Sequence, residues 1–314
     1  MSNTTYIGNS AYCYSNSTSM LLASIKEDLK PSLIEVVGGV GIGAYALPDS
    51  NISFLSGYSG LPDKAISRSL KTLGFEFTEE SSTSPDKPPF DKLRRYLIDS
   101  PVLVGPLDMG YLSYDPDHKN HYEIDHFVLI YQIRDNNVLL HDPAGFPNVL
   151  LDLNQLELAW KAEKIQYKEG YYHFWTLPKR VNNPSKTDIY KQAINGFRDI
   201  YLTGEKYAKL KNRVIDYEAI TFMAENIGNE NLKPSEIGML TGFILPLGSR
   251  RASDFSDFFK PFDKNLSELK HKQAQLLGLG HSLAVAHSWK ELSSVLVDFA
   301  DLEKQFKQKI IDSV

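Results

Sequence analysis

The sequence predicts an α+β domain followed by an all-helical domain. Up to about residue 180, short apolar runs alternate with Gly, Pro and Asn turns, as in a domain that mixes helices and strands. From about residue 185 onward, apolar residues recur at helical spacing and turn signals become rare. The stretch LPKRVNNPSKTD (177–188) combines two prolines, a basic pair and two asparagines, which is typical of a boundary. We therefore expect domains over 1–180 and 185–314.

Local patterns place the elements of the first domain. Apolar residues at helical spacing predict three helices, over 15–29, 63–75 and 91–100. Runs rich in β-branched, Leu and aromatic residues predict strands over 101–108, 126–133, 138–143 and 170–178. The Asp-Asn-Asn tract between the second and third of these runs predicts a hairpin. A further strand-like run, SLIEVVGG (32–39), enters a glycine cluster.

Four segments of the second domain carry helical periodicity: 187–202, 217–227, 266–283 and 289–311. In the last of them an i, i+3, i+4, i+7 pattern predicts one buried stripe. The residues of that stripe are Leu292, Val295, Leu296, Phe299 and Leu302.

Composition and charge exclude several classes of protein. The 314 residues carry 34 basic against 39 acidic side chains, a net charge of −5 without a long block of either sign, which argues against a nucleic-acid binder. No apolar run approaches the roughly 20 residues of a membrane helix. The polar N-terminus lacks the basic start and apolar stretch of a signal peptide. The single cysteine, Cys13, excludes disulfides within the chain, so we expect a cytoplasmic protein.

Three residues satisfy the requirements of nucleophilic catalysis by cysteine. Cys13 lies at the mouth of a predicted helix, where a thiolate is stabilised. His126 opens one strand of the predicted hairpin and Asp142 closes the other. The start of one antiparallel strand lies beside the end of the next, so we expect His126 and Asp142 to be neighbours. A base beside the thiol and a third group that orients the base complete the pattern.

Each of these residues also has an ordinary structural interpretation. Cys13 could be a small buried apolar residue, His126 a hydrogen-bonded histidine, and Asp142 a turn initiator before Pro143. The glycine cluster GGVGIG (38–43) matches neither phosphate-binding motif, so we interpret it as close backbone approach to the catalytic helix or a substrate groove. The stretch DPDHKNHYEIDH (115–126) lacks metal-ligand spacing and is interpreted as a solvated loop.

Five separated segments, in order, resemble the N-terminal domain of butirosin-biosynthesis protein H, a papain-like cysteine-nucleophile family. They are CYSNSTSMLLAS around the cysteine, the cluster VVGGVGIGAYAL, the segment PVLVGPLDMGYLSYDP, and the strands IDHFVLIYQI and VLLHDP. The helical second half is similar to the domain that commonly follows in these proteins. One departure is Tyr12, since relatives often carry a histidine immediately before the nucleophile.

The resemblance implies a papain-like core with Cys13 as nucleophile, His126 as general base and acid, and Asp142 as the group that orients it. It implies acyl transfer from a thioester, bound to a carrier protein or CoA, through Cys13 to an amine in specialised biosynthesis, with no metal or organic cofactor. Family members also take an oxyanion donor upstream of the cysteine. Asn9, together with the backbone N–H of Cys13, is the nearest candidate, and Asn16 or another backbone group is the alternative. Asp108, Tyr111 and Tyr114 are expected to line the substrate site.

Two other classes of function remain open at this stage. A cysteine hydrolase (peptidase, amidase or thioesterase) would use the same triad with water as the acceptor. A binding module would keep the fold without catalysis, although such a module has no chemical need for all three residues. The helical domain could supply an acceptor pocket, a docking face for an acyl carrier protein, or the interface of a homo-oligomer.

Overall fold

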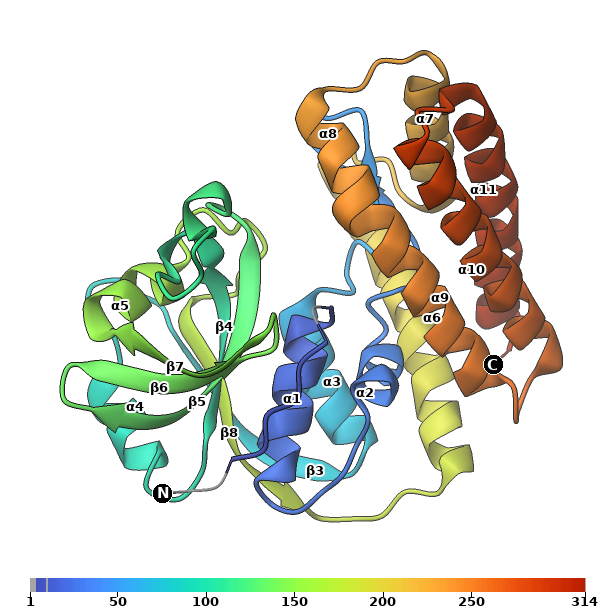
Figure 1. Cartoon of the computed structure of the whole chain (residues 1–314). Helices are drawn as coiled ribbons and strands as arrows, with labels where there is room; N and C mark the ends of the chain where they lie inside the picture. The colour runs from blue at the N-terminus through green and yellow to red at the C-terminus, as the bar shows by residue number, and fades with distance from the viewer. Residues whose placement is uncertain (1–3, 10, 314) are drawn as a thin grey trace. The chain divides into compact units, whose positions relative to one another are not determined.

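The computed structural model describes residues 4–9 and 11–313 and divides into two compact units. The first unit comprises the chain up to Ile34 together with Ser69–Asn183, and it contains a six-stranded sheet (Figure 1). The second comprises Glu35–Arg68 together with the chain from Pro184 onward, and it is mainly helical. The expected α+β character of the N-terminal region and the helical character of the C-terminal region are thus confirmed.

The sheet of the first unit is antiparallel throughout, in the order β3-β8-β4-β5-β6-β7. Its strands are β3 (Phe75–Ser82), β4 (Val102–Asp108), β5 (Asp125–Arg134), β6 (Asn137–Asp142), β7 (Phe146–Asp152) and β8 (Tyr171–Arg180). The hairpin of β5 and β6 is present as expected. Arg134 pairs with Asn137, so the turn consists of Asp135 and Asn136, and Asp135 takes the left-handed conformation with φ 52°.

Helices cover both faces of this sheet. On one face, α5 (Leu153–Lys161) buries Leu156 and Trp160 against alternate strand residues such as Val128 and Ile130. On the other face lies α1 (Cys13–Ala23), where the Tyr14 ring meets Phe127 at a centroid distance of 6.0 Å. Two further helices are α3 (Pro62–Thr72), which spans the unit boundary, and α4 (Phe90–Tyr96).

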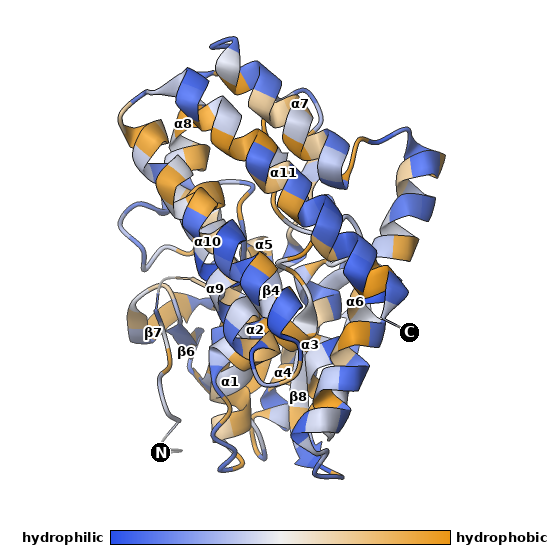
Figure 2. Ribbon diagram, turned by 90° about the vertical axis from the view of Figure 1, so that its right-hand side faces the viewer, coloured by the Kyte–Doolittle hydropathy of each residue, from blue (hydrophilic) through white to orange (hydrophobic). Residues whose placement is uncertain are grey.

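The second unit is built from helices joined by short loops. They are α6 (Lys186–Lys211), α7 (Asp216–Gly228), α8 (Pro234–Met239), α9 (Leu245–Phe259), α10 (Lys264–Val285) and α11 (Trp289–Asp312), with a π-helical turn (Leu240–Ile244) between α8 and α9. Hydrophilic and hydrophobic residues alternate along α10 and α11 (Figure 2), as expected of helices with one buried face. No helix among the described residues is both long and apolar enough to cross a membrane.

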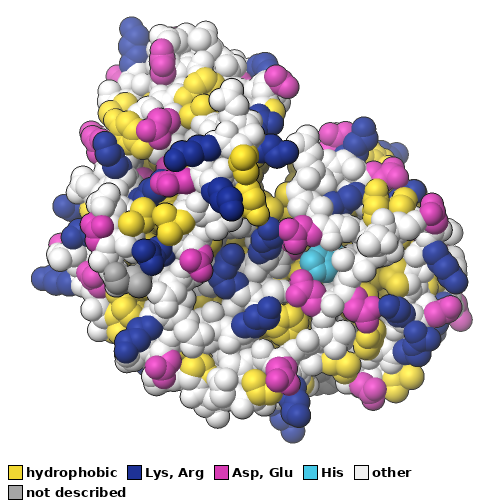
Figure 3. Space-filling model, turned by 180° about the vertical axis from the view of Figure 1, so that it is seen from behind, with side chains coloured by type: hydrophobic (Ala, Val, Ile, Leu, Met, Phe, Trp, Pro, Cys, Tyr) yellow, Lys and Arg dark blue, Asp and Glu magenta, His cyan; other side chains and the backbone are white. Residues whose placement is uncertain are grey.

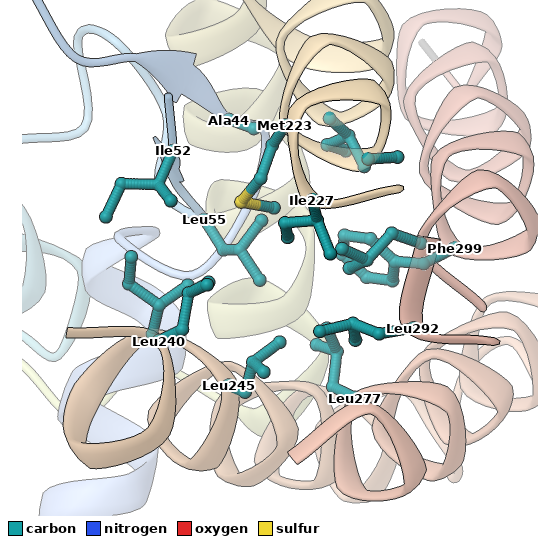
Figure 4. Packing of buried hydrophobic residues seen from close by; sticks show 14 of the residues in the cluster. Ala44, Ile52, Leu55, Met223, Ile227, Leu240, Leu245, Leu277, Leu292 and Phe299 are labelled. Carbon is teal, nitrogen blue, oxygen red and sulfur yellow. The ribbon is translucent and has the colours of Figure 1, made fainter. Parts of the chain in front are cut away.

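The segment Glu35–Arg68 belongs to the helical unit, although the boundary near residue 180 assigned it to the first domain. It contains the short strands β1 (Tyr45–Ala46) and β2 (Ser53–Phe54). Figure 4 shows the reason for the difference, because Ala44, Ile52 and Leu55 lie in one apolar cluster with helical residues. Those helical partners include Met223, Ile227, Leu240, Leu245, Leu277, Leu292 and Phe299.

Two local predictions are wrong. The helix expected over 15–29 ends at Ala23, because the chain reverses with Lys26 in the left-handed conformation and Ser19 Oγ donates to Leu29 O. The strand-like run after Pro31 is helix α2 (Pro31–Gly38). Proline is favoured in the first helical turn, and Gly39, with φ 72°, follows the last helical residue.

The glycine cluster does approach other backbone and side chains closely, but its contacts are with helices of its own unit. A Cβ atom on Gly39 would lie 2.6 Å from Ile200 Cδ1 and 3.2 Å from Phe197 Cδ1, both on α6. One on Gly41 would lie 2.9 Å from Arg251 Cδ on α9. Within the helical unit, these glycines therefore allow the close approach of the backbone to α6 and α9.

Gly39→Ala should lower the free energy of unfolding of the helical unit by about 2 kcal/mol or more, because it combines a left-handed backbone with a clash against α6. Thermal and urea unfolding followed by circular dichroism would measure this. Gly238→Ala is the matched control, since no atom lies within 4 Å of its added methyl group. Equal stability of the two variants would contradict the proposed packing.

Candidate active site

Cys13 is the first residue of α1 and is half-buried. The residue before it, Tyr12, is buried and takes the left-handed conformation with φ 57° and ψ 49°. A bulky residue in this region is strained, and strain of this kind gathers at functional sites. The first backbone N–H groups of a helix have no partner within the helix, so the thiol sits at the positive end of the helix dipole.

Side-chain hydrogen bonds hold α1 against the sheet. Ser17 Oγ donates to the backbone oxygen of Phe127 on β5 at 3.0 Å, one residue beyond His126. Thr18 Oγ1 donates to Tyr14 O within the helix at 2.7 Å. The segment Ser15–Ser19 is buried despite being entirely polar, which is tolerable because such bonds satisfy the hydroxyl groups. The Ser17 hydrogen bond thereby holds α1, which begins with Cys13, against β5, the strand that carries His126.

His126 and Asp142 form a buried pair, with 2.7 Å between His126 Nε2 and Asp142 Oδ1. Their side chains are only 6% and 2% exposed. The Cys13 side chain also acts on this imidazole, through a hydrogen bond and its charge, and both raise the pKa of His126. The proximity expected from the hairpin is present, and the three residues stand in the order Cys13, His126, Asp142.

The charge state of the imidazole follows from these contacts. Burial by itself lowers the pKa of His126. The Asp142 charge and the hydrogen bonds with Asp142 and Cys13 outweigh burial, so the pKa of His126 lies well above its ordinary value of 6.5. A protonated imidazole beside a thiol favours the thiolate, which is the nucleophilic form.

Asp142 is held in its ionised form by several donors. Its Oδ1 also accepts the backbone N–H of Ala144 at 2.7 Å, and its Oδ2 accepts the Tyr114 hydroxyl at 2.7 Å. Burial raises the pKa of Asp142, but His126, Ala144 and Tyr114 together hold it below its ordinary value. A carboxylate with donors on both oxygens is fixed in orientation as well as in charge.

The loop before Cys13 is fastened by Asn16, one helical turn into α1. Asn16 Nδ2 donates to Tyr12 O at 3.0 Å, to Ala11 O at 2.5 Å and to Asn9 Oδ1 at 3.0 Å. The backbone N–H of Ala11 also donates to Asn9 Oδ1, at 3.3 Å. The Asn16 Nδ2 group is therefore committed within the protein, whereas Asn9 uses its Oδ1 atom in these contacts.

The other expected site residues have different surroundings. Asp108 Oδ1 accepts the N–H groups of Gly110 and Glu123, so the carboxylate caps a turn. The Tyr111 ring packs edge-on against Tyr122, at 5.3 Å between centroids. Only Tyr114 joins the pair of His126 and Asp142 directly, and it does so through the carboxylate.

Sequence reasoning did not identify His141, the residue before Asp142. His141 Nδ1 accepts the N–H of Asn148 at 3.1 Å, and Nε2 lies 3.0 Å from Thr4 O. Its ring also packs against Tyr6, whose hydroxyl donates to Asp142 O at 3.2 Å. Burial lowers the pKa of His141, which suits a neutral structural imidazole. His141 thus fastens the N-terminal segment to β6.

Other features of the described residues bear on binding. Within residues 4–9 and 11–313, no group of three or more His, Cys, Asp or Glu side chains could hold a metal ion. On the face drawn in Figure 3, acidic side chains lie among the basic ones, in keeping with the nearly balanced charge of the sequence.

The fold and the site define a class of protein with two units. The sheet unit brings a cysteine, a histidine and an aspartate together, and the second unit is helical. A family model described as the YobF C-terminal domain matches residues 210–311, which contain α7–α10 and most of α11. A protein of Bacillus subtilis (strain 168) named "Uncharacterized protein YobF" is 40% identical over 306 residues, 98% of each chain. The chain belongs to the YobF family.

Proposed function

We propose that this protein is a cysteine-dependent acyltransferase with a papain-like first unit. The observation that carries the proposal is that Cys13 interacts with His126 and His126 interacts with Asp142, with the cysteine at a helix N-terminus. The resemblance of five segments to the butirosin-biosynthesis protein H domain supports acyl transfer in specialised biosynthesis. The donor would be an acyl thioester on CoA or an acyl carrier protein, and the acceptor a small-molecule amine.

In the first half-reaction, the Cys13 thiolate attacks the carbonyl carbon of the donor thioester. The resulting oxyanion would be stabilised by the backbone N–H of Cys13 and the Nδ2 group of Asn9. Asn9 is favoured over Asn16, because Asn16 Nδ2 already lies within hydrogen-bond distance of three acceptors inside the protein. Collapse of the intermediate breaks the donor C–S bond, and the leaving thiolate takes the proton of the His126 imidazolium.

In the second half-reaction, the acceptor amine attacks the Cys13 thioester and gives a proton to His126. Collapse releases the amide and returns Cys13 as the thiolate beside a protonated imidazole. Asp142 remains ionised and keeps the His126 ring oriented, as the third member of such triads does. Water in place of the amine would make the same residues a hydrolase.

Intact-protein mass spectrometry with a panel of acyl thioesters tests the proposal. Because Cys13 is the single cysteine, we expect a mass gain equal to the acyl group that is lost in Cys13→Ala. An amine should discharge the adduct faster than buffer alone does. His271→Ala, an exposed change in α10, is the control and should acylate normally.

Three other results would count against acyl transfer. Donor consumption without preference for amines would instead indicate a hydrolase. An adduct that persists in Cys13→Ala would place the chemistry elsewhere. Absence of both adduct and turnover with every donor class would contradict the proposed activity.

A further inference from the structure

Tyr114 completes the set of hydrogen bonds around Asp142. Its hydroxyl donates to Asp142 Oδ2 at 2.7 Å, whereas His126 and the Ala144 amide occupy Oδ1. The Asp142 side chain is almost wholly buried, so an unpartnered Oδ2 could not turn to water. The tyrosine is therefore the donor that lets both carboxylate oxygens be satisfied inside the protein.

The phenol is held in place and stays protonated. Its ring packs against Phe146, on β7, with 5.6 Å between centroids. Burial and the nearby Asp142 and Asp115 carboxylates raise the pKa of Tyr114 well above 10, so the hydroxyl is a donor at every pH of interest. This geometry differs from the substrate-lining role expected from the sequence, because the hydroxyl is directed at the carboxylate.

We propose that Tyr114 is a positioning residue that acts through Asp142, keeping this carboxylate ionised and aimed at His126. The inference rests on the proposed function, since it requires that the Cys13–His126 pair be chemically active. Without the phenol, a buried oxygen of Asp142 loses its donor, and the carboxyl group protonates more readily. A protonated Asp142 no longer supports the imidazolium, so the reactive form of Cys13 would be lost at a higher pH.

Several polar groups of the described residues face Asp142. His126 faces it from β5, the Tyr6 hydroxyl bonds its backbone oxygen from the N-terminal segment, and Cys13 at the start of α1 interacts through His126. Asp115 lies next to Tyr114 in the chain and contributes negative charge there. Among these, only Tyr114 donates to Asp142 Oδ2, so its removal alters a single contact of the carboxylate.

The test is the pH profile of Cys13 alkylation by iodoacetamide in the full-length protein. In Tyr114→Phe we expect the acidic limb of the profile to move up by about one pH unit, which lowers the rate on that limb by about tenfold. Tyr96→Phe is the matched control, because it also removes a phenol–carboxylate bond, that of Tyr96 to Glu80 at 2.5 Å, but leaves Asp142 untouched. Its profile should equal that of the wild type.

A second comparison separates positioning from folding. In an Asp142→Asn background, Tyr114→Phe should produce no further shift, since the route through the carboxylate is gone. A shift that persists in that background, or a wild-type profile for Tyr114→Phe, would overturn the inference. By contrast, a wild-type Cys13 that reacts no faster than in His126→Ala would overturn the proposed function itself. Unfolding curves of each variant confirm that the proteins compared are folded.

Discussion

His126→Ala should lower the rate of Cys13 acylation by about a thousandfold or more, the largest effect on activity that we expect from a change outside Cys13. The substitution removes the proton acceptor and donor, and also the positive charge that favours the thiolate. The remaining reactivity should follow the pH dependence of a small-molecule thiol. Stopped-flow acylation with the best donor of the panel, between pH 5 and 9, would measure both effects.

The control for this prediction is again His271→Ala, which should keep the wild-type rate and profile. His141→Gln offers a stricter comparison, because this neighbour of Asp142 is buried but bonds Thr4 and Asn148. We expect it to change stability more than reactivity. A His126→Ala protein with a wild-type profile would show that the imidazole plays no part in activating the thiol.

The same pair should contribute to stability within a defined pH window. Folding raises the pKa of His126, so its contribution is complete below the ordinary value of 6.5 and is lost as the pH rises through the higher folded value. Folding lowers the pKa of Asp142, so its contribution is complete above 3.8 and is lost as the pH falls through the lower folded value. The difference in unfolding free energy between the wild type and His126→Ala should therefore be greatest between these two ordinary values.

Glu303→Ala should have the largest effect on stability, a loss of about 3–5 kcal/mol from the helical unit. Glu303 and Lys270 are paired at 3.2 Å with side chains only 3% and 2% exposed. Lys270 Nζ also lies 3.9 Å from the centre of the Phe306 ring. Removal of the carboxylate leaves a buried ammonium without its partner, which is far more costly than loss of a surface ion pair.

Glu303 also connects this pair to the glycine cluster. Its Oε1 accepts the N–H of Gly43 at 2.7 Å and the hydroxyl of Tyr201 at 2.5 Å, and Gln273 Nε2 donates to its Oε2 at 2.8 Å. These donors and Lys270 hold the pKa of Glu303 below its ordinary value against the effect of burial. Burial lowers the pKa of Lys270, and Glu303 offsets part of that effect.

Urea unfolding followed by helical circular dichroism would measure the loss. The double variant Lys270→Met/Glu303→Leu should recover a large part of it, because an apolar pair leaves no unpaired charge. Lys264→Met/Glu268→Leu changes an exposed pair on α10, at 3.7 Å, and should be nearly neutral. If Glu303→Ala proved as stable as that surface variant, the buried pair would have no structural role.

Features that depend on neighbouring residues could be predicted from the sequence. The hairpin of β5 and β6 was predictable, because its two-residue turn and flanking apolar runs are adjacent in the chain. The proximity of His126 to Asp142 followed from that hairpin alone. The position of Cys13 at the start of α1 was also predictable, although the end of that helix was not.

Elements whose secondary structure depends on tertiary packing were not predicted from the sequence. The run after Pro31 is rich in β-branched residues and reads as a strand, yet it forms α2. Helices α8 and α9 contain one proline each, Pro234 and Pro246, and one glycine each, which hide the helical pattern in the sequence. Strand propensity and breaker residues are weak guides where a tertiary surface compensates for them.

What the sequence determined by itself is therefore a cysteine at a helix start and a histidine–aspartate hairpin, both fixed by interactions between near neighbours. Only the tertiary structure brought Tyr114 to Asp142, 28 residues away, and Glu303 to Lys270, 33 residues away. It also placed Glu35–Arg68 with the helices. These contacts join residues that share no local pattern, because burial and charge pairing are decided by which surfaces meet when the chain folds.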